Sequence, residues 1–220
     1  MPWAHRNTYG RAGQPARQNV QFLRELSMGE IVSRLAAFLL YAALQGFLLA
    51  ALARATGDRR PQHDGRLSLN PFVHLSVWGA AFAALFAVSW VRSIWYDAAQ
   101  SRLGRYGAAL VTFLGLAAMV VLVPLIDLLQ PLVLLLPRTG SYAVLYVLDQ
   151  LQLIAISSVL LNLLPVPGLV GGGFLQALWP NAERRLRQAE PICIAIIMAI
   201  IVALGFPDPT TMGLPLLSIG

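Results

Sequence analysis

The sequence predicts an all-α polytopic membrane protein with about five transmembrane helices. Apolar residues make up 57% of the 220-residue chain and charged residues only 12%, whereas about a quarter of a soluble globular protein is charged. The apolar residues gather in segments of roughly 20 residues, the length that crosses a bilayer as a helix. The sixteen basic residues are all arginines, and most lie in the connections between these segments, as membrane topology requires.

The predicted helices follow in order along the chain. The first contains Arg34 near its start, where a long side chain can extend to the membrane surface. The second carries Trp78, Trp90, Trp95 and Tyr96 in or near it, which fit an interfacial aromatic belt. The fifth is short and must tilt little. The five segments are 31–53, 72–91, 107–129, about 145–165 and 191–206.

The connections between the helices carry turn-forming residues. Segment 56–71 has Gly, Pro, Asn and Asp where short strands or turns are expected. Pro165 and Pro167 end the fourth helix, 174–180 is expected to form a short helix in the interface, and 181–190 a polar surface connection. The chain is therefore divided into a polar basic tail (1–27), a membrane domain (28–206) and a Pro-rich tail (207–220).

Two membrane topologies satisfy the positive-inside rule equally. If all five segments span, ten arginines lie inside with the amino terminus and five lie outside. If 72–91 is instead re-entrant and leaves on the side where it enters, the amino terminus lies outside. The ten arginines of 54–105 and 184–187 are then inside, again against five. The sequence leaves this choice open.

Two motifs in separate connections carry a family resemblance. They are "GD…GRLSLNPFVHLSVWG" over 57–79 and "NLLPVPGLVGGGFL" over 162–175. Both resemble the site-2 protease family of intramembrane zinc metalloproteases in its short bacterial form, which typically reads GD, GRLTLNPxxHxDPxG and NLLPxPxLDGGRxL. The resemblance implies a site-2-protease-like core over roughly 30–205. The matching residues, for which we expect structural roles, are Gly57, Asp58, Gly65, Arg66, Asn70, Pro71, His74, Asn162, Pro165, Gly171 and Gly172.

The residues that this resemblance would place at a catalytic centre are absent. Counted back from the GD pair, the two histidines of HExxH fall on Gln45 and Leu49, the general base falls on Gly46, and the aspartate of LDGG falls on Val170. A catalytic zinc needs about three protein ligands and an open position for water, and Leu and Val offer no donor atom. We therefore expect no catalytic residue, no metal, no cofactor and no enzyme activity.

The other potential metal ligands are scattered along the chain. His5, His63, His74 and Cys193 share no spacing that is typical of a metal site. His74 is expected to form hydrogen bonds near the membrane interface rather than to bind a metal.

Two features indicate contacts between helices. Ala42, Gly46 and Ala50 are spaced by four residues, and small residues at this spacing let helices pack closely in lipid. The abundance of Ala and Gly in such segments would give the same pattern. Asp149 lies near the start of the fourth helix, where it can form a buried pair or contact a partner. We expect helix-packing or partner-binding roles for these four residues.

The function that fits these observations best is a structural or accessory subunit of a larger membrane complex, built on a non-catalytic site-2-protease-like core. Its partners would be other membrane subunits and the lipid bilayer, not nucleic acid, because the arginines follow the pattern of membrane connections. The composition suggests the bacterial cytoplasmic (inner) membrane. Three alternatives stay open: a regulatory pseudoprotease that binds transmembrane helices in a groove between helices one and four without cleaving them, an active metalloprotease with an unusual site, and a small transporter or channel.

Overall fold

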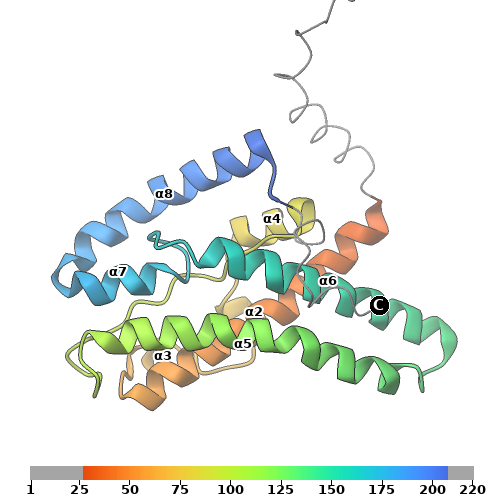
Figure 1. The fold of residues 1–220 in the computed structure, drawn as a ribbon, viewed down its shortest axis with the longest axis horizontal. Coiled ribbons are helices and arrows are strands. Elements are labelled where there is room, and N and C mark those ends of the chain that lie inside the picture. The colour runs from red at the N-terminus through yellow and green to blue at the C-terminus, as the bar shows by residue number, and fades with distance from the viewer. Residues whose placement is uncertain (1–26, 208–220) are drawn as a thin grey trace, which may run out of the picture.

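The computed structural model describes residues 27–207, and its regular elements in that range are all helices (Figure 1). The long helices are α2 (Met28–Thr56), α5 (Tyr106–Val133), α6 (Arg138–Asn162) and α8 (Glu183–Leu204). The short ones are α3 (Arg60–His63), η1 (Pro71–Val73), α4 (Val77–Phe86), α7 (Gly172–Leu178) and η2 (Pro180–Ala182). The two predicted tails, 1–27 and 207–220, lie almost entirely outside the described residues.

Four helices within residues 27–207 are long and apolar enough to cross a membrane: α2, α5, α6 and α8. The ends of α2 follow local sequence signals. The Ser27 side chain accepts a hydrogen bond from the Glu30 N–H at 3.1 Å and caps the amino end. Gly57, with a φ of 104°, caps the other end. The prediction of an all-α membrane protein is confirmed.

The prediction that 72–91 forms a spanning helix is wrong. Its longest helical part, α4, has ten residues and is about 15 Å long, which is half the thickness of the hydrocarbon core. The helix starts at the cap formed by Ser76 and stops at Ala87, whose φ of 51° is left-handed. After Ala87 the chain runs as a non-helical return segment, residues 88–97, and the short helix and this segment form a hairpin.

The hairpin begins and ends at the same end of the helix bundle. The Arg102 N–H donates to the Thr56 carbonyl oxygen at 2.8 Å, and the Asp97 N–H donates to Asp58 Oδ2 at 2.8 Å. In Figure 1, α3, α7 and the first turn of α5 lie at this end, and the loop between α5 and α6 lies at the opposite end. A hairpin of this kind is the arrangement that the re-entrant topology requires, and α4 is too short for the topology with five spans. Segment 57–105 both begins and ends at this end of the bundle, which we call the arginine-rich end.

Two predictions for the connections need correction. Segment 56–71 forms the expected turns together with α3 and part of η1, but the expected strands are absent, since no strand occurs in residues 27–207. Segment 181–190 is mostly the first part of α8 rather than a surface connection, and the Glu183–Arg187 ion pair stabilises that helical turn. The short helix expected at 174–180 is confirmed as α7, and α6 ends at Asn162, shortly before Pro165 and Pro167.

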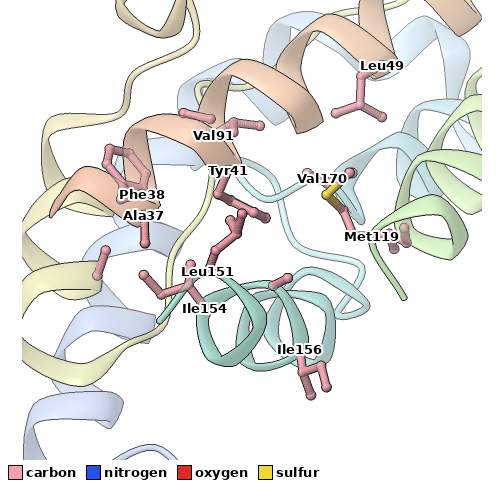
Figure 2. Close-up of a cluster of buried hydrophobic side chains, with 14 of the residues drawn as sticks. Ala37, Phe38, Tyr41, Leu49, Val91, Met119, Leu151, Ile154, Ile156 and Val170 are labelled. Carbon is pink, nitrogen blue, oxygen red and sulfur yellow. The ribbon is translucent and has the colours of Figure 1, made fainter. Parts of the chain in front are cut away.

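The core lies where α2, α5 and α6 pack together, and the return segment also contributes to it (Figure 2). A second, smaller cluster joins α4 and the return segment to α8 through Phe82, Trp90, Ile194 and Ile197. A Cβ atom at Gly79 of α4 would overlap the Trp90 carbonyl oxygen. Only a glycine there lets the short helix lie so close to the return segment.

Candidate functional site

The positions that the resemblance places at a catalytic centre lie inside the packed core. Gln45, Gly46 and Leu49 are all buried on α2, and Val170 is buried in the loop between α6 and α7. Figure 2 shows Leu49 and Val170 in the same cluster of buried side chains as Met119 of α5. The fold thus brings the four predicted positions into the core and surrounds them with apolar side chains.

Gly46 is covered by the imidazole of His74. A Cβ atom added at position 46 would overlap Cγ and Nδ1 of this ring. His74 itself follows η1 and is fully buried, and its Nε2 lies 2.8 Å from the Ser68 carbonyl oxygen. The ring therefore occupies the space that a side chain at position 46 would need. His74 thus forms a hydrogen bond, as expected, and its ring packs inside the chain.

Leu49 lies one turn further along the same face of α2. Its side chain packs against the backbone of Gly115 on α5, where a Cβ atom would overlap it. The space left between Leu49, Val170 and the return segment is about 10 Å³, about the volume that one water needs. A peptide substrate could not enter a space of this size without moving the surrounding chain.

Three buried polar groups near the middle of α2 and at His74 have no hydrogen-bond partner among residues 27–207. They are the Tyr41 hydroxyl, both polar atoms of the Gln45 amide, and Nδ1 of His74. Nε2 of His74 carries the proton that it donates to the Ser68 carbonyl, so in the neutral ring Nδ1 is unprotonated. Burial, and to a lesser extent the charge of Arg66, lowers the pKa of His74, although its bond to the Ser68 carbonyl opposes this shift.

The residues present at this centre do not fit a catalytic metal. No group of three or more His, Cys, Asp or Glu side chains converges within the described range 27–207. Of the four positions, only Gln45 has a donor atom, and a neutral amide oxygen is a weak zinc ligand. His74 could add one nitrogen, which would still leave the site short of three ligands. The donor set therefore gives no means of activating a water molecule.

Several of the motif residues instead hold the return segment in place. Asn162 donates to the carbonyl oxygens of Ser89 (2.9 Å) and Ser158 (2.7 Å), and its Oδ1 accepts from the Val170 N–H at 3.1 Å. The Ser89 N–H donates to Oγ of Ser158 at 2.9 Å. Arg66 donates to the Arg92 carbonyl oxygen at 2.9 Å. Side chains from distant positions thus satisfy a backbone that has no neighbouring strand.

The other predicted structural residues shape turns around this hairpin. Gly65 has a φ of 71°, a left-handed conformation that suits glycine. Asn70 caps η1 by accepting from the Phe72 N–H at 3.1 Å, and Pro71 is the first residue of that turn. A Cβ atom at Gly171 or Gly172 would crowd carbonyl oxygens of the preceding loop, which contains Pro165.

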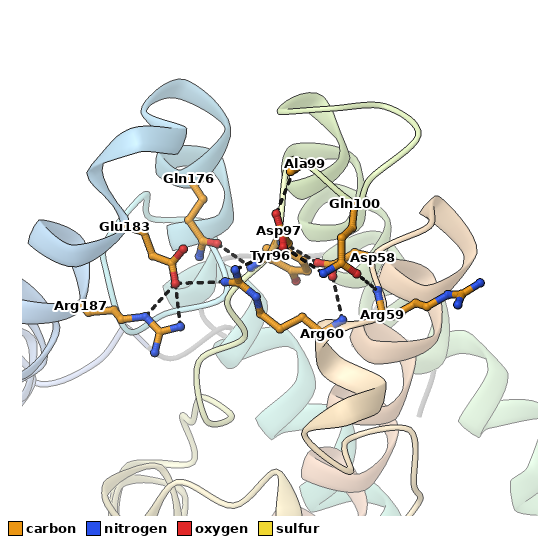
Figure 3. Close-up of polar contacts among 10 residues, drawn as sticks. All are labelled: Asp58, Arg59, Arg60, Tyr96, Asp97, Ala99, Gln100, Gln176, Glu183 and Arg187. Carbon is orange, nitrogen blue, oxygen red and sulfur yellow. Dashed lines mark hydrogen bonds and ion pairs between the residues drawn. The ribbon is translucent and has the colours of Figure 1, made fainter.

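A polar network at the arginine-rich end ties the hairpin to α8 (Figure 3). Asp58 is 1% exposed and accepts from the N–H groups of Arg60 and Asp97. Arg60 in turn pairs with Asp97 at 3.5 Å and with Glu183 at 3.0 Å. A cavity of about 190 Å³ lies beside these groups. Since each carboxylate already has partners within the chain, we assign this network a structural role.

Sequence reasoning missed the role of Arg34. The side chain was expected to extend to the membrane surface, but it is 4% exposed. It pairs with Glu30, donates to Oε1 of Gln150 at 3.1 Å, and donates to the carbonyl oxygens of Ala84 and Leu85 at 3.4 Å. A cation beside the last carbonyls of α4 stabilises that helix end. No pattern in the sequence links Arg34 to a helix fifty residues away.

The residues expected to pack or to bind partners fall into two groups. Ala42, Gly46 and Ala50 are buried inside the chain's own core. Asp149, by contrast, is exposed on α6.

No family model, no curated protein and no solved structure matches this chain.

Proposed function

We propose that this chain is a non-catalytic, site-2-protease-like membrane protein that serves as a structural or accessory subunit of a larger membrane complex. The proposal rests on one observation: side chains of the protein itself fill the space at the positions where the resembled family has its catalytic centre. The His74 ring covers Gly46, and Leu49 packs on Gly115 beside Val170. The residue types there supply contact and shape but too few donor atoms to hold a metal.

The arrangement suits a scaffold. A re-entrant hairpin is fixed at its tip by Arg34 and along its return segment by Asn162, so its position relative to α2 and α6 is well defined. Broad apolar faces of α5 and α8 remain exposed, among them Leu128, Leu132 and Ile196. Such faces suit lipid or other membrane subunits, and we place the chain in a bacterial cytoplasmic membrane on its composition.

A regulatory pseudoprotease is the second candidate. The groove expected between helices one and four is not observed, because α2 and α6 pack together in the core. A cleft of about 390 Å³ opens instead between the return segment and α8, lined by Trp90, Val91, Ile194 and Met198 among others. Its mainly apolar lining favours a role in which a transmembrane segment binds there without being cut.

Gentle extraction of the tagged full chain tests the first proposal. We expect defined membrane subunits to co-purify in a fixed ratio and to survive size-exclusion chromatography in mild detergent. A chain that runs alone, with no loss of folded protein, would refute a role as a subunit. A photo-crosslinker at Met198 tests the second candidate. It predicts adducts with single-pass proteins that a crosslinker at the exposed Leu128 does not give.

A further inference from the structure

Asp149 presents an unpartnered carboxylate on the outer surface of α6. Its side chain is exposed, and no hydrogen bond or ion pair to it occurs among residues 27–207. It lies about 16 Å along the helix from Arg138, at about 1.5 Å per residue. It lies near the middle of 140–162, the part of α6 that is long and apolar enough to cross a membrane. The carboxylate is therefore within the apolar belt of the molecule.

The surface around Asp149 is a defined helix face. Tyr142, Tyr146 and Asp149 follow at i, i+4 and i+7, so they lie above one another on one side of α6, and all three are exposed. Tyrosine rings offer large, stiff contact area with a polar tip. We call these three residues the α6 face. It differs from a plain lipid-facing surface in carrying one charge and two aromatic rings in line.

The neighbouring aspartate shows how this chain satisfies a carboxylate internally. Asp127 of α5 accepts hydrogen bonds from the amides of Gln152 and Gln130. Asp149 lies within electrostatic reach of Asp127 but has no such donor. A carboxylate facing hydrocarbon is disfavoured and in membrane proteins is normally paired with a cation or a hydrogen-bond donor. No donor or cation pairs with Asp149 among residues 27–207, so an ionised Asp149 needs a partner from outside the described part of the chain.

We propose that the α6 face is the docking surface for a transmembrane helix of a partner subunit that carries an arginine or lysine at the level of Asp149. The inference rests on the proposed function, because it names the chemistry of one partner of an accessory subunit. A second copy of the described chain is a poor candidate for this partner, because its arginines are not placed to reach Asp149. In the half of the bundle that holds Asp149, Arg34 is buried in its own network and Arg138 lies at the helix end.

Synthetic helices test this pairing without knowledge of the natural partner. Three peptides of about 22 residues, all leucine and alanine, carry one central arginine, one central glutamate or neither. The full chain, labelled at Cys193 for energy transfer, is reconstituted in phosphatidylcholine vesicles with each labelled peptide. We expect the arginine peptide to bind about tenfold more tightly than the uncharged one, and the glutamate peptide to bind no better than the uncharged one.

Matched variants assign this preference to the α6 face. Asp149→Asn should remove the preference for the arginine peptide, while Asp64→Asn, which changes an exposed carboxylate in the connection after α3, should leave it intact. Both variants should melt at the wild-type temperature, since neither side chain contributes to the packed core. Equal binding of all three peptides, or a preference that survives Asp149→Asn, would overturn the inference.

The chain's own amino-terminal tail is the competing occupant. If Arg24→Gln raises the affinity for the arginine peptide, the tail already fills the α6 face, and the partner inference is wrong. Co-purification separates this failure from that of the proposed function. A wild-type chain without companions refutes the subunit role, whereas an Asp149→Asn chain that keeps the wild-type companions in full refutes only the docking surface.

Discussion

At the scale of single residues, the contact between Gly46 and His74 decides what the centre of the molecule can do. Gly46→Ala adds a Cβ atom that overlaps the imidazole, and we expect it to lower the free energy of unfolding by about 1–3 kcal/mol. Reversible unfolding of the full chain in mixed micelles would measure the change.

A second substitution, at His74, tests whether this contact is the cause of the loss. Removing the ring together with its Cβ atom by His74→Gly should allow Gly46→Ala at little further cost, because an added Cβ at position 46 would overlap both. The double variant should therefore be no less stable than His74→Gly alone. Additive losses would show that the added methyl group meets something other than the His74 ring.

At Gln45 we expect a substitution to raise the stability of the protein rather than lower it. Its amide is buried with no hydrogen-bond partner among the described residues, and an unsatisfied buried polar group costs about 1–3 kcal/mol. Gln45→Met keeps the length of the side chain and removes the polar atoms, so we expect the variant to unfold at a higher temperature than the wild type. A loss of stability would show that the amide has a partner, such as a buried water or an ion.

Much of this residue-scale account was predictable from the sequence, and part was not. The absence of donor atoms at Leu49 and Val170 follows directly from their identity. The burial of His74 does not, because it depends on how η1 folds back onto a glycine 28 positions earlier in the chain. The burial of Arg34 was equally hidden, since its partners on α4 and α6 are distant in sequence.

At the scale of elements, the long helices were predictable and the hairpin was not. The length and hydropathy of their apolar segments identify α2, α5 and α6, because about 20 consecutive apolar residues are typical of a membrane-spanning helix. Segment 72–91 has the same composition, yet it breaks at Ala87. The break is stabilised by Ser158 and Asn162 on α6, which bond the backbone of Ser89. A tertiary contact of this kind leaves no trace in local composition.

Asn162 is therefore the residue on which the hairpin most depends. Asn162→Ala leaves the Ser89 carbonyl and the Val170 N–H without their partner, and we expect a loss of about 2–4 kcal/mol in the free energy of unfolding. Asn181→Ala, at an exposed position in η2, should change the stability by less than about 0.5 kcal/mol. Limited proteolysis should also cleave the Asn162→Ala variant within 88–97, where the wild type resists. An equal effect of the two substitutions would contradict this role.

At the scale of the whole molecule, the re-entrant hairpin selects a membrane orientation. The ten arginines of 54–105 and 184–187 belong to segments that open at the arginine-rich end, while Arg138 lies at the opposite end. From the positive-inside rule we predict that the arginine-rich end faces the cytoplasm.

Cysteine labelling would test this orientation. In a Cys193→Ser background, a membrane-impermeant maleimide should label Arg138→Cys in intact cells. It should label Arg184→Cys only after the cells are lysed. The reverse pattern would mean that the bundle lies the other way round in the membrane.

The zinc content of the purified full chain tests the central claim most directly. The chain would be expressed in zinc-supplemented cells, extracted without chelators and measured by mass spectrometry of the metal alongside the Gln45→Met variant. A centre built from Gly46, Leu49 and Val170 predicts far less than one zinc per chain and no difference between the two proteins. About one zinc per chain, lost in Gln45→Met, would show that the centre of this molecule holds a metal after all.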